Sequence, residues 1–225
     1  MSDQFMIGID SVDRLFKMCE EHICKKNGWV TPGDEAHGKG WALVRNTWEQ
    51  TMHKIVMQGV PVINIVHEKV EEQQINRTKV NRVMMNLPRR AKEVVADSSD
   101  FIFYFGLNEK DERTMFCKPT MEHEVGRRGS GDLDMSPMEP TYEALNERIY
   151  KETGSDIPEL APMVTVMGRP KIGKTTFLSE FPDTVLFDCE NGSKFLRKKF
   201  KKVYLCRTWM DFINGLKETF NEGDN

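Results

Sequence analysis

A glycine-rich stretch late in the chain, GRPKIGKT at residues 168–175, carries the clearest chemistry in the sequence. It matches the phosphate-binding pattern G-x-x-x-x-G-K-[ST], with Gly168, Gly173, Lys174 and Thr175 at the fixed positions. In this motif backbone N–H groups surround the phosphates, the lysine reaches the β- and γ-phosphates, and the final hydroxyl holds Mg²⁺. The stretch therefore predicts a site for ATP and Mg²⁺, with nucleotide contacts from Gly168, Arg169, Pro170, Lys171, Ile172, Gly173, Lys174, Thr175 and Thr176.

The sequence on either side of the motif supports this interpretation. MVTVM at residues 163–167 is a short apolar, β-branched run typical of a buried parallel strand. KTTFLSEF, from Lys174 onward, is typical of the first turns of a helix. A strand, a glycine loop and a helix N-terminus are the elements that phosphate binding requires, because the helix dipole favours the negative charge.

The acid that completes such a site must come from elsewhere, because only 50 residues follow Thr175. A Mg–nucleotide site needs a carboxylate at the end of a neighbouring strand. Two apolar strands end in aspartate: TVLFDCE at residues 184–190, and FMIGIDSVD at residues 5–13. The second has the Walker B form and ends in Asp10. We therefore expect Asp10, from the start of the chain, to join Thr175 in holding Mg²⁺.

Reading the chain as if its two ends were joined places these pieces in one order. The fold expected is α/β, a RecA-like P-loop NTPase with a doubly wound, mainly parallel sheet in a circularly permuted order. Residues 1–225 then form one domain, with a Walker B and sensor portion (1–145), a linker at the join (146–160) and a P-loop portion (161–225). The alternative is that residues 161–225 are a truncated second domain. The remaining elements expected are helices near 11–26, 41–58 and 208–220, and strands near 60–66, 101–106, 113–117 and 203–205.

The amino-acid composition bears on the partners and the cellular setting of the protein. The 225 residues contain 32 basic and 35 acidic side chains, a net charge of −3, so polyanion binding would depend on local patches. Five cysteines without repeating spacing indicate a reducing, cytoplasmic setting. No apolar run approaches the ~20 residues that span a bilayer.

Rotated in this way, the sequence resembles a known family. GRPKIGKTTFLSEFPDTVLFDCENGSKFL followed by IGIDSVDRLFKMCEEHICKKNG is similar to phage-type RecA-like ATPases of the AAA_24 kind, relatives of the recombination ATPases that accompany single-strand annealing proteins. The resemblance covers nearly the whole chain. It implies that Glu190 activates the attacking water and that His67, which ends the strand INIVH, senses the γ-phosphate. Lys174 and Asp10 complete the catalytic set.

The resemblance also implies a homo-oligomer. In RecA-like ATPases a basic residue from a neighbouring subunit stabilises charge on the transferring phosphoryl group. The candidates for this role in trans are Lys118, Arg127 and Arg128.

Single-stranded DNA is the expected partner, and two segments are candidates for binding it. Residues 68–92 follow the sensor strand, where RecA-like proteins place a mobile DNA-contacting loop, and residues 27–41 combine glycines with tryptophans that would stack on bases. The run at 194–207 is also basic, but it is interpreted as a helix leading into a strand. The DNA candidates are Arg77, Lys79, Arg82, Arg89, Arg90, Lys92, Trp29 and Trp41.

The favoured function is thus a Mg²⁺-dependent, DNA-stimulated ATPase of phage recombination or replication, with a phage single-strand-binding or annealing protein as a further partner. Two alternatives stay open: a P-loop small-molecule kinase, and a DNA-independent module that switches a protein partner with nucleotide. ATP turnover with and without single-stranded DNA, and phosphate transfer to an added nucleoside, would separate them.

Overall fold

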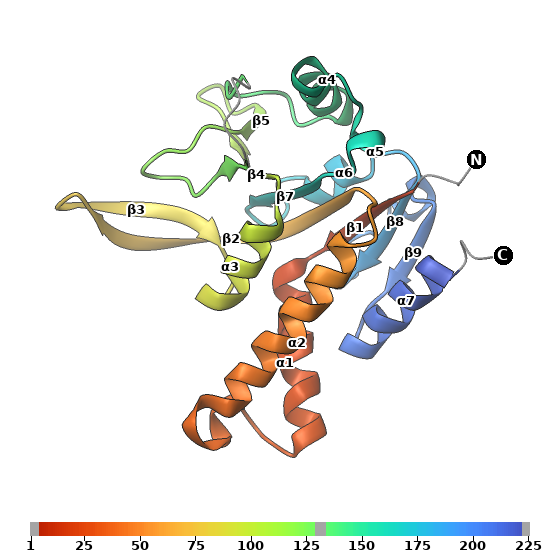
Figure 1. The fold of residues 1–225 in the computed structure, drawn as a ribbon. Helices are drawn as coiled ribbons and strands as arrows, with labels where there is room; N and C mark the ends of the chain where they lie inside the picture. Colours follow the sequence, from red (N-terminus) through yellow and green to blue (C-terminus); the bar gives the residue numbers. More distant parts are fainter. Residues whose placement is uncertain (1–4, 129–133, 222–225) are drawn as a thin grey trace.

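The computed structural model describes residues 5–128 and 134–221, which share one central β-sheet (Figure 1). Its nine strands follow the order β5-β4-β7-β2-β1-β8-β9, while β3 pairs with β2 and β6 pairs with β4. The strands from β4 to β9 in that order pair in parallel; β3, β5 and β6 pair antiparallel to their neighbours. The strands are β1 (Met6–Asp10), β2 (Val62–Ile75), β3 (Thr78–Met85), β4 (Phe101–Leu107), β5 (Arg113–Phe116), β6 (Gly126–Arg127), β7 (Met163–Gly168), β8 (Thr184–Asp188) and β9 (Lys202–Leu205).

Helices cover both faces of the sheet, so its central strands are buried on both sides and are apolar along most of their length. In β2, Val62 and Val66 pack on one face, while Ile63 and Ile65 pack on the other. The first face is covered by α1 (Val12–Asn27), α2 (Lys39–Val56), α3 (Arg89–Ser98) and α7 (Trp209–Asn221); the second by α4 (Tyr142–Thr153), α5 (Ile157–Leu160) and α6 (Lys174–Leu178). None of the helices in the described ranges is long and apolar enough to cross a membrane.

The register of the parallel strands brings their carboxyl ends to one edge of the sheet. Asp10 at the end of β1 is paired with Asp188 at the end of β8. His67 in β2 is paired with Gly168 at the end of β7. Because β2 lies between β1 and β7, side chains from distant parts of the chain meet at this edge.

Both ends of the chain contribute to the same sheet. β1, the first strand, lies in the interior of the sheet between β2 and β8. Near the described ends, the rings of Phe5 and Phe220 lie 6.1 Å apart between centroids. Residues 1 and 225, which the permuted order requires to be neighbours, lie outside the described residues. The expected linker at 146–160 consists of the later part of α4, a left-handed Gly154 and the single turn of α5.

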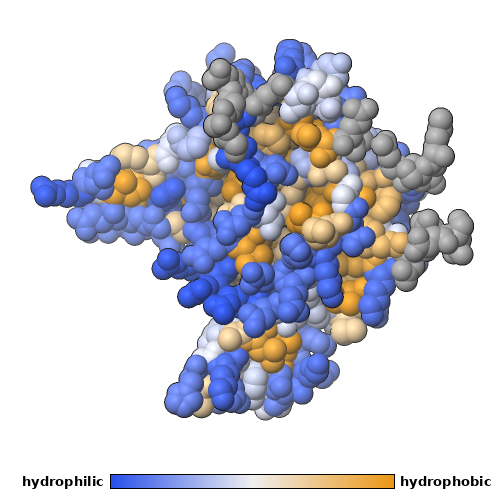
Figure 2. Space-filling model, viewed as in Figure 1, coloured by the Kyte–Doolittle hydropathy of each residue, from blue (hydrophilic) through white to orange (hydrophobic). Residues whose placement is uncertain are grey.

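The prediction of a loop at residues 68–92 is wrong. β2 continues beyond the sheet and pairs with β3 from Glu68↔Met85 to Ile75↔Thr78, which makes a projecting hairpin (Figure 1). Asn76 and Arg77, both with positive φ, form its two-residue turn. Polar residues occupy both faces of the hairpin near its turn, so the alternation of apolar and polar residues that usually marks a strand is weak there. Backbone pairing holds this part of the hairpin, and its surface is mostly hydrophilic (Figure 2).

The prediction of a helix in the basic run after residue 193 is also wrong. The connection from β8 to β9 contains only a short 3₁₀ turn, η3 (Arg197–Lys199). Asp188 fixes residues 190–193 in a turn, and Phe200 is buried just before β9. The few residues left between these anchors must reach the start of the next parallel strand, so there is no room for a regular helix.

Candidate active site

The loop between β7 and α6 has the backbone that its glycines predict. A Cβ at Gly168 would lie 2.5 Å from the carbonyl oxygen of Phe105, so β7 passes β4 too closely there for a larger residue. Gly173 has φ 110, a conformation that L side chains rarely adopt, and α6 begins at the next residue. Residues 169–173 therefore leave the sheet edge and lead directly into a helix N-terminus, the arrangement that binds phosphates.

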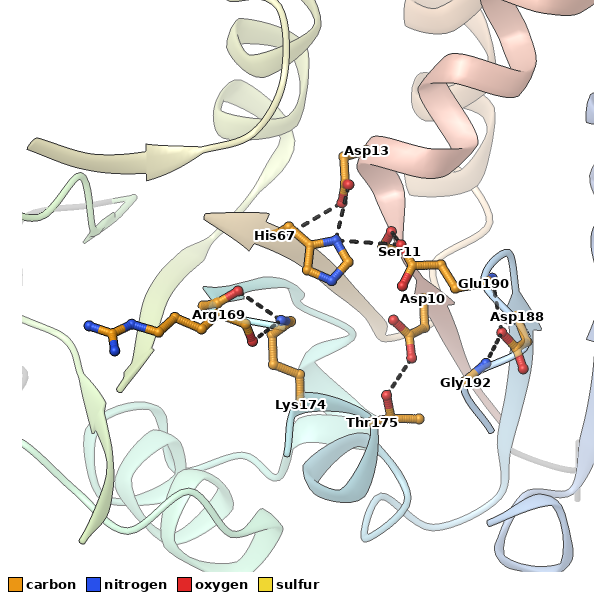
Figure 3. Close-up of polar contacts among 11 residues, drawn as sticks. Asp10, Ser11, Asp13, His67, Arg169, Lys174, Thr175, Asp188, Glu190 and Gly192 are labelled. Carbon is orange, nitrogen blue, oxygen red and sulfur yellow. Dashed lines mark hydrogen bonds and ion pairs between the residues drawn. The ribbon is translucent and has the colours of Figure 1, made fainter. Parts of the chain in front are cut away.

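Lys174 is buried beneath this loop. Its Nζ donates hydrogen bonds of 2.8 Å to the carbonyl oxygens of Gly168 and Arg169 (Figure 3). Burial lowers the pKa of the ammonium group, although the negative charges of Asp10, Asp13 and nearby glutamates oppose that shift. An ammonium group held only by two carbonyl oxygens is poised to exchange them for the stronger, charged oxygens of a phosphate.

Thr175 and Asp10 meet although they are 165 residues apart in sequence. The hydroxyl of Thr175 donates a 2.6 Å hydrogen bond to Oδ2 of Asp10, which is only 4% exposed. Burial raises the pKa of Asp10 to about 6, and the charges of Glu190 and Asp188 add to this, while the Thr175 bond and Lys174 oppose it. A hydroxyl beside a poorly compensated buried carboxylate supplies the hard oxygen ligands that Mg²⁺ prefers, so these residues fit that ion.

Glu190 and His67 face each other across the same edge of the sheet. Ser11 donates a 2.6 Å hydrogen bond to Oε1 of Glu190, and Nδ1 of His67 lies 3.4 Å from the same oxygen (Figure 3). The sequence placed both residues in the site but gave no partner for either. The structure supplies Ser11, from the junction of β1 and α1, as the group that orients the glutamate.

Asp13 is a site residue that the sequence interpretation missed. It lies in the first turn of α1, and its carboxylate accepts hydrogen bonds of 3.1 Å from the backbone N–H of His67 and from Nδ1 of its ring. The hydrogen bond to Asp13 raises the pKa of His67, even though burial opposes it. Burial acts to raise the pKa of Asp13, but the bonds from His67 outweigh it and the pKa is lowered. The pair therefore favours a charged imidazolium beside an ionised carboxylate, with Glu190 within reach.

Asp13, His67 and Glu190 each place one possible ligand atom within 4.8 Å of the other two. All three groups are already engaged by one another or by Ser11. These contacts explain their geometry as a hydrogen-bonded chain that sets the ring and the carboxylate of Glu190 in place.

Asp188 fixes the turn that carries Glu190. Its two carboxylate oxygens accept hydrogen bonds from the backbone N–H groups of Glu190, Gly192 and Ser193 at 3.0–3.1 Å, and from the Ser193 hydroxyl at 2.5 Å. Asp188 is fully buried and its carboxylate is occupied by the turn, so this acid is a backbone anchor. The sequence signal was present, because Asp188 is followed within five residues by Asn191, Gly192 and Ser193, residue types typical of a turn.

Two arginines lie close to the phosphate loop. Nε of Arg169 lies 3.4 Å from Oε1 of Glu68. Burial raises the pKa of Tyr104, and the negative charge of Glu68 adds to that shift. Arg113, the first residue of β5, is not part of the predicted site. A Cβ at Gly173 would lie 3.0 Å from its Nη1, so its guanidinium lies directly over the loop.

The three basic residues expected to act in trans lie apart from the phosphate loop of their own chain. Arg127 pairs with Phe101 at the start of β4, whereas the loop follows Gly168, which is paired with Phe105 farther along that strand. Arg128 lines a cavity beside Arg127. Lys118 is exposed at the rim of a second cavity formed with aromatic and methionine side chains.

The DNA candidates lie in three separate places: the hairpin, the stretch from the end of α1 to the first turn of α2, and α3. Arg77, Lys79 and Arg82 belong to the hairpin; Trp41 lies in the first turn of α2, and Trp29 packs against the core. Several of the cations are paired with acids: Lys79 with Glu72, Arg89 with Glu93, and Lys92 with Glu124. Arg90 is exposed near the start of α3.

A family model described as an AAA domain, AAA_24, matches residues 6–129 and 160–224. The first matched segment contains Asp10, Asp13 and His67; the second contains the phosphate loop and Glu190. No curated protein and no solved structure matches the chain.

Proposed function

The chain belongs to the AAA_24 family of AAA domains, and from its site geometry we propose that it binds ATP with Mg²⁺ and hydrolyses it. The observation that carries this proposal is the contact between Thr175 and Asp10, because it joins a phosphate-loop hydroxyl to a strand-end carboxylate from the opposite end of the chain. Lys174 lies beside both, so the three groups that a Mg–ATP complex requires converge on one point.

In the proposed reaction Lys174 leaves the carbonyl oxygens of Gly168 and Arg169 and binds the β- and γ-phosphates. Thr175 and Asp10 would hold Mg²⁺, which would supply positive charge for the phosphate oxygens. Glu190, oriented by Ser11, positions and deprotonates the attacking water. His67, held by Asp13, donates a hydrogen bond toward the terminal phosphate.

We also propose that the order of elements is a circular permutation of the RecA-like order and that residues 1–225 form one domain. One sheet contains β1 and β2 from the first matched segment and β7, β8 and β9 from the second. The contact between Phe5 and Phe220 keeps the described ends close, which is the condition that makes such a rearrangement tolerable. The shared site at Asp10 and Thr175 favours this arrangement over a truncated second domain.

The biological setting proposed is phage DNA recombination or replication, with turnover stimulated by single-stranded DNA. A homo-oligomer would bring Lys118, Arg127 or Arg128 of one subunit toward the nucleotide of the next. A single-strand-binding or annealing protein is the further partner proposed.

The test is steady-state ATP hydrolysis by the purified protein with and without Mg²⁺ and single-stranded DNA, beside a Lys174→Ala control. We expect Mg²⁺-dependent turnover that DNA stimulates and that the control abolishes. Turnover unaffected by DNA would refute the DNA-stimulated part and leave the ATPase. Equal turnover by the Lys174→Ala variant would refute the assignment of the site itself.

A further inference from the structure

The segment from Lys194 to Lys201, KFLRKKFK, contains as many basic residues as any eight-residue stretch of the sequence. Five of its eight residues are basic and none is acidic, in a chain whose net charge is −3. The five basic side chains are all exposed. They are Lys194, Arg197, Lys198, Lys199 and Lys201.

The same segment carries an exposed aromatic side chain, Phe195. Phe195 is 91% exposed, whereas Phe200 is buried and Leu196 packs partly against the core beneath the sheet. These two apolar anchors hold the segment against the protein and leave Phe195 facing solvent. Burying a phenylalanine side chain contributes about 1.5–3 kcal/mol, so the fold forgoes that gain at Phe195 while burying Phe200 and partly burying Leu196.

The charge of this segment is available to a ligand, whereas much of the charge on the hairpin is not. Across the described residues, no carboxylate lies within ion-pair distance of the five cations, and the recorded side-chain partner of Arg197 is the neutral Asn191, at 2.9 Å. In the hairpin, Lys69 is paired with Glu71 and Lys79 with Glu72. A polyanion would have to displace those acids on the hairpin, but it would meet uncompensated charge on the segment.

We propose that residues 194–201 are the surface that binds single-stranded nucleic acid, with the phosphates on the lysines and arginine and an unpaired base stacked on Phe195. This inference rests on the proposed DNA-stimulated ATPase and moves its DNA contact away from the hairpin and the tryptophans. Stacking on an exposed aromatic ring contributes about 1–3 kcal/mol per base and needs a base that is not already stacked in a duplex.

Other occupants fit the segment less well. A single exposed ring offers little apolar area for insertion into a membrane surface, where stable anchoring combines several apolar contacts with charge. Protein interfaces have cores in which lysine is depleted, whereas Phe195 lies in a segment with four lysines, one of which, Lys194, places its Nζ 5.8 Å from the ring centroid. Single-stranded nucleic acid needs both features that the segment supplies, a charged track and an accessible ring.

The segment is also connected to the catalytic edge of the sheet. Arg197 Nη2 donates to Oδ1 of Asn191, the residue that directly follows Glu190. Asp188 fixes the same turn through Glu190, Gly192 and Ser193. A phosphate that draws Arg197 away from Asn191 therefore acts on the turn that holds the water-activating carboxylate, which gives a route for DNA to stimulate turnover.

The experiment measures binding of a fluorescein-labelled oligothymidine by fluorescence anisotropy at two salt concentrations. Phe195→Ala should weaken binding by about 5- to 150-fold, the equivalent of one stacked base. Lys198→Glu should weaken it by roughly tenfold and reduce its salt dependence, because a phosphate contact is lost. Lys217→Glu, the same charge change at an exposed site on α7, and Lys79→Glu on the hairpin should each change affinity by less than about threefold.

The outcomes separate this inference from the proposed ATPase. If Phe195→Ala and Lys198→Glu bind the oligonucleotide as tightly as the unmodified protein, or if Lys79→Glu alone loses binding, the assignment of the surface is overturned. It is also overturned if only phosphatidylserine vesicles, and no oligonucleotide, bind the segment. ATP turnover measured without DNA reports on the ATPase independently. Circular-dichroism melts of each variant show whether a lost interaction reflects lost folding.

Discussion

Replacing Asp10 by asparagine should stabilise the nucleotide-free protein at neutral pH and remove its response to Mg²⁺. The folded protein raises the pKa of Asp10 from 3.8 to about 6, chiefly by burial and also through the charges of Glu190 and Asp188. Asparagine cannot ionise, yet its carbonyl oxygen still accepts the hydrogen bond that Thr175 donates to Asp10. The substitution therefore removes an unfavourable buried charge while keeping the local contact.

The size of this effect follows from the two pKa values. Each pKa unit corresponds to 1.36 kcal/mol, so the ionised Asp10 costs the folded state about 3 kcal/mol at pH 7.5. Because the folded pKa lies above the unfolded one, this cost develops as pH rises from 3.8 to 6, and about half of it is present at pH 5. For a chain of this length about 3 kcal/mol corresponds to a rise in melting temperature of roughly 6–12 °C.

The assay is thermal unfolding in EDTA at pH 7.5 and pH 5, followed by the same measurement with Mg²⁺ and ATP. Asp13→Asn is the matched control, because the pKa of Asp13 is lowered and its ionised form is favoured by His67. We expect Asp10→Asn to melt higher than the unmodified protein, most clearly at pH 7.5. We expect Asp13→Asn to melt lower, at least as clearly at pH 5 as at pH 7.5, because the pKa of His67 is raised and its imidazolium is fully present at the lower pH. Mg–ATP should raise the melting temperature of the unmodified protein but not that of Asp10→Asn.

Two results would refute this reasoning. If Asp10→Asn melts below the unmodified protein at both pH values, the ionised carboxylate stabilises the fold and is not an unfavourable charge waiting for a cation. If the gain is the same at pH 5 and pH 7.5, it does not arise from the ionisation of Asp10.

Two further predictions concern the chemistry around the phosphates. Glu190→Gln should retain ATP binding, measured by titration of a fluorescent ATP analogue, but its turnover should fall at least about 100-fold, because the amide cannot accept a proton from water. Turnover within tenfold of the unmodified enzyme would contradict the assigned role. Arg113→Ala should weaken nucleotide binding by roughly 10- to 100-fold, because the guanidinium lies over Gly173 and one hydrogen bond to a charged group contributes about that much. Unchanged affinity in the same titration would show that this arginine does not contact the phosphates.

Much of the architecture was predictable because it depends on short stretches of sequence. The interior strands β1, β7 and β8 are continuous apolar runs, and the lengths of α1, α2 and α7 lie close to those predicted. The projecting hairpin was missed because its polar faces carry no apolar alternation and its turn is an asparagine–arginine pair. Backbone hydrogen bonds between β2 and β3 stabilise this part of the fold, and the order of polar and apolar residues along the sequence gives little sign of them.

The sequence by itself identified the phosphate loop, because the motif GRPKIGKT is contiguous and the left-handed backbone at Gly173 is a local property. It also identified Asp10, since an acid that ends an apolar strand is visible locally. Only the tertiary structure paired Asp13 with His67 across 54 residues and Ser11 with Glu190 across 179. It also made Asp188 a buried anchor and left the charges around Phe195 uncompensated. These pairings depend on the order and register of the strands, which long-range backbone hydrogen bonds fix and which no local run of residues specifies.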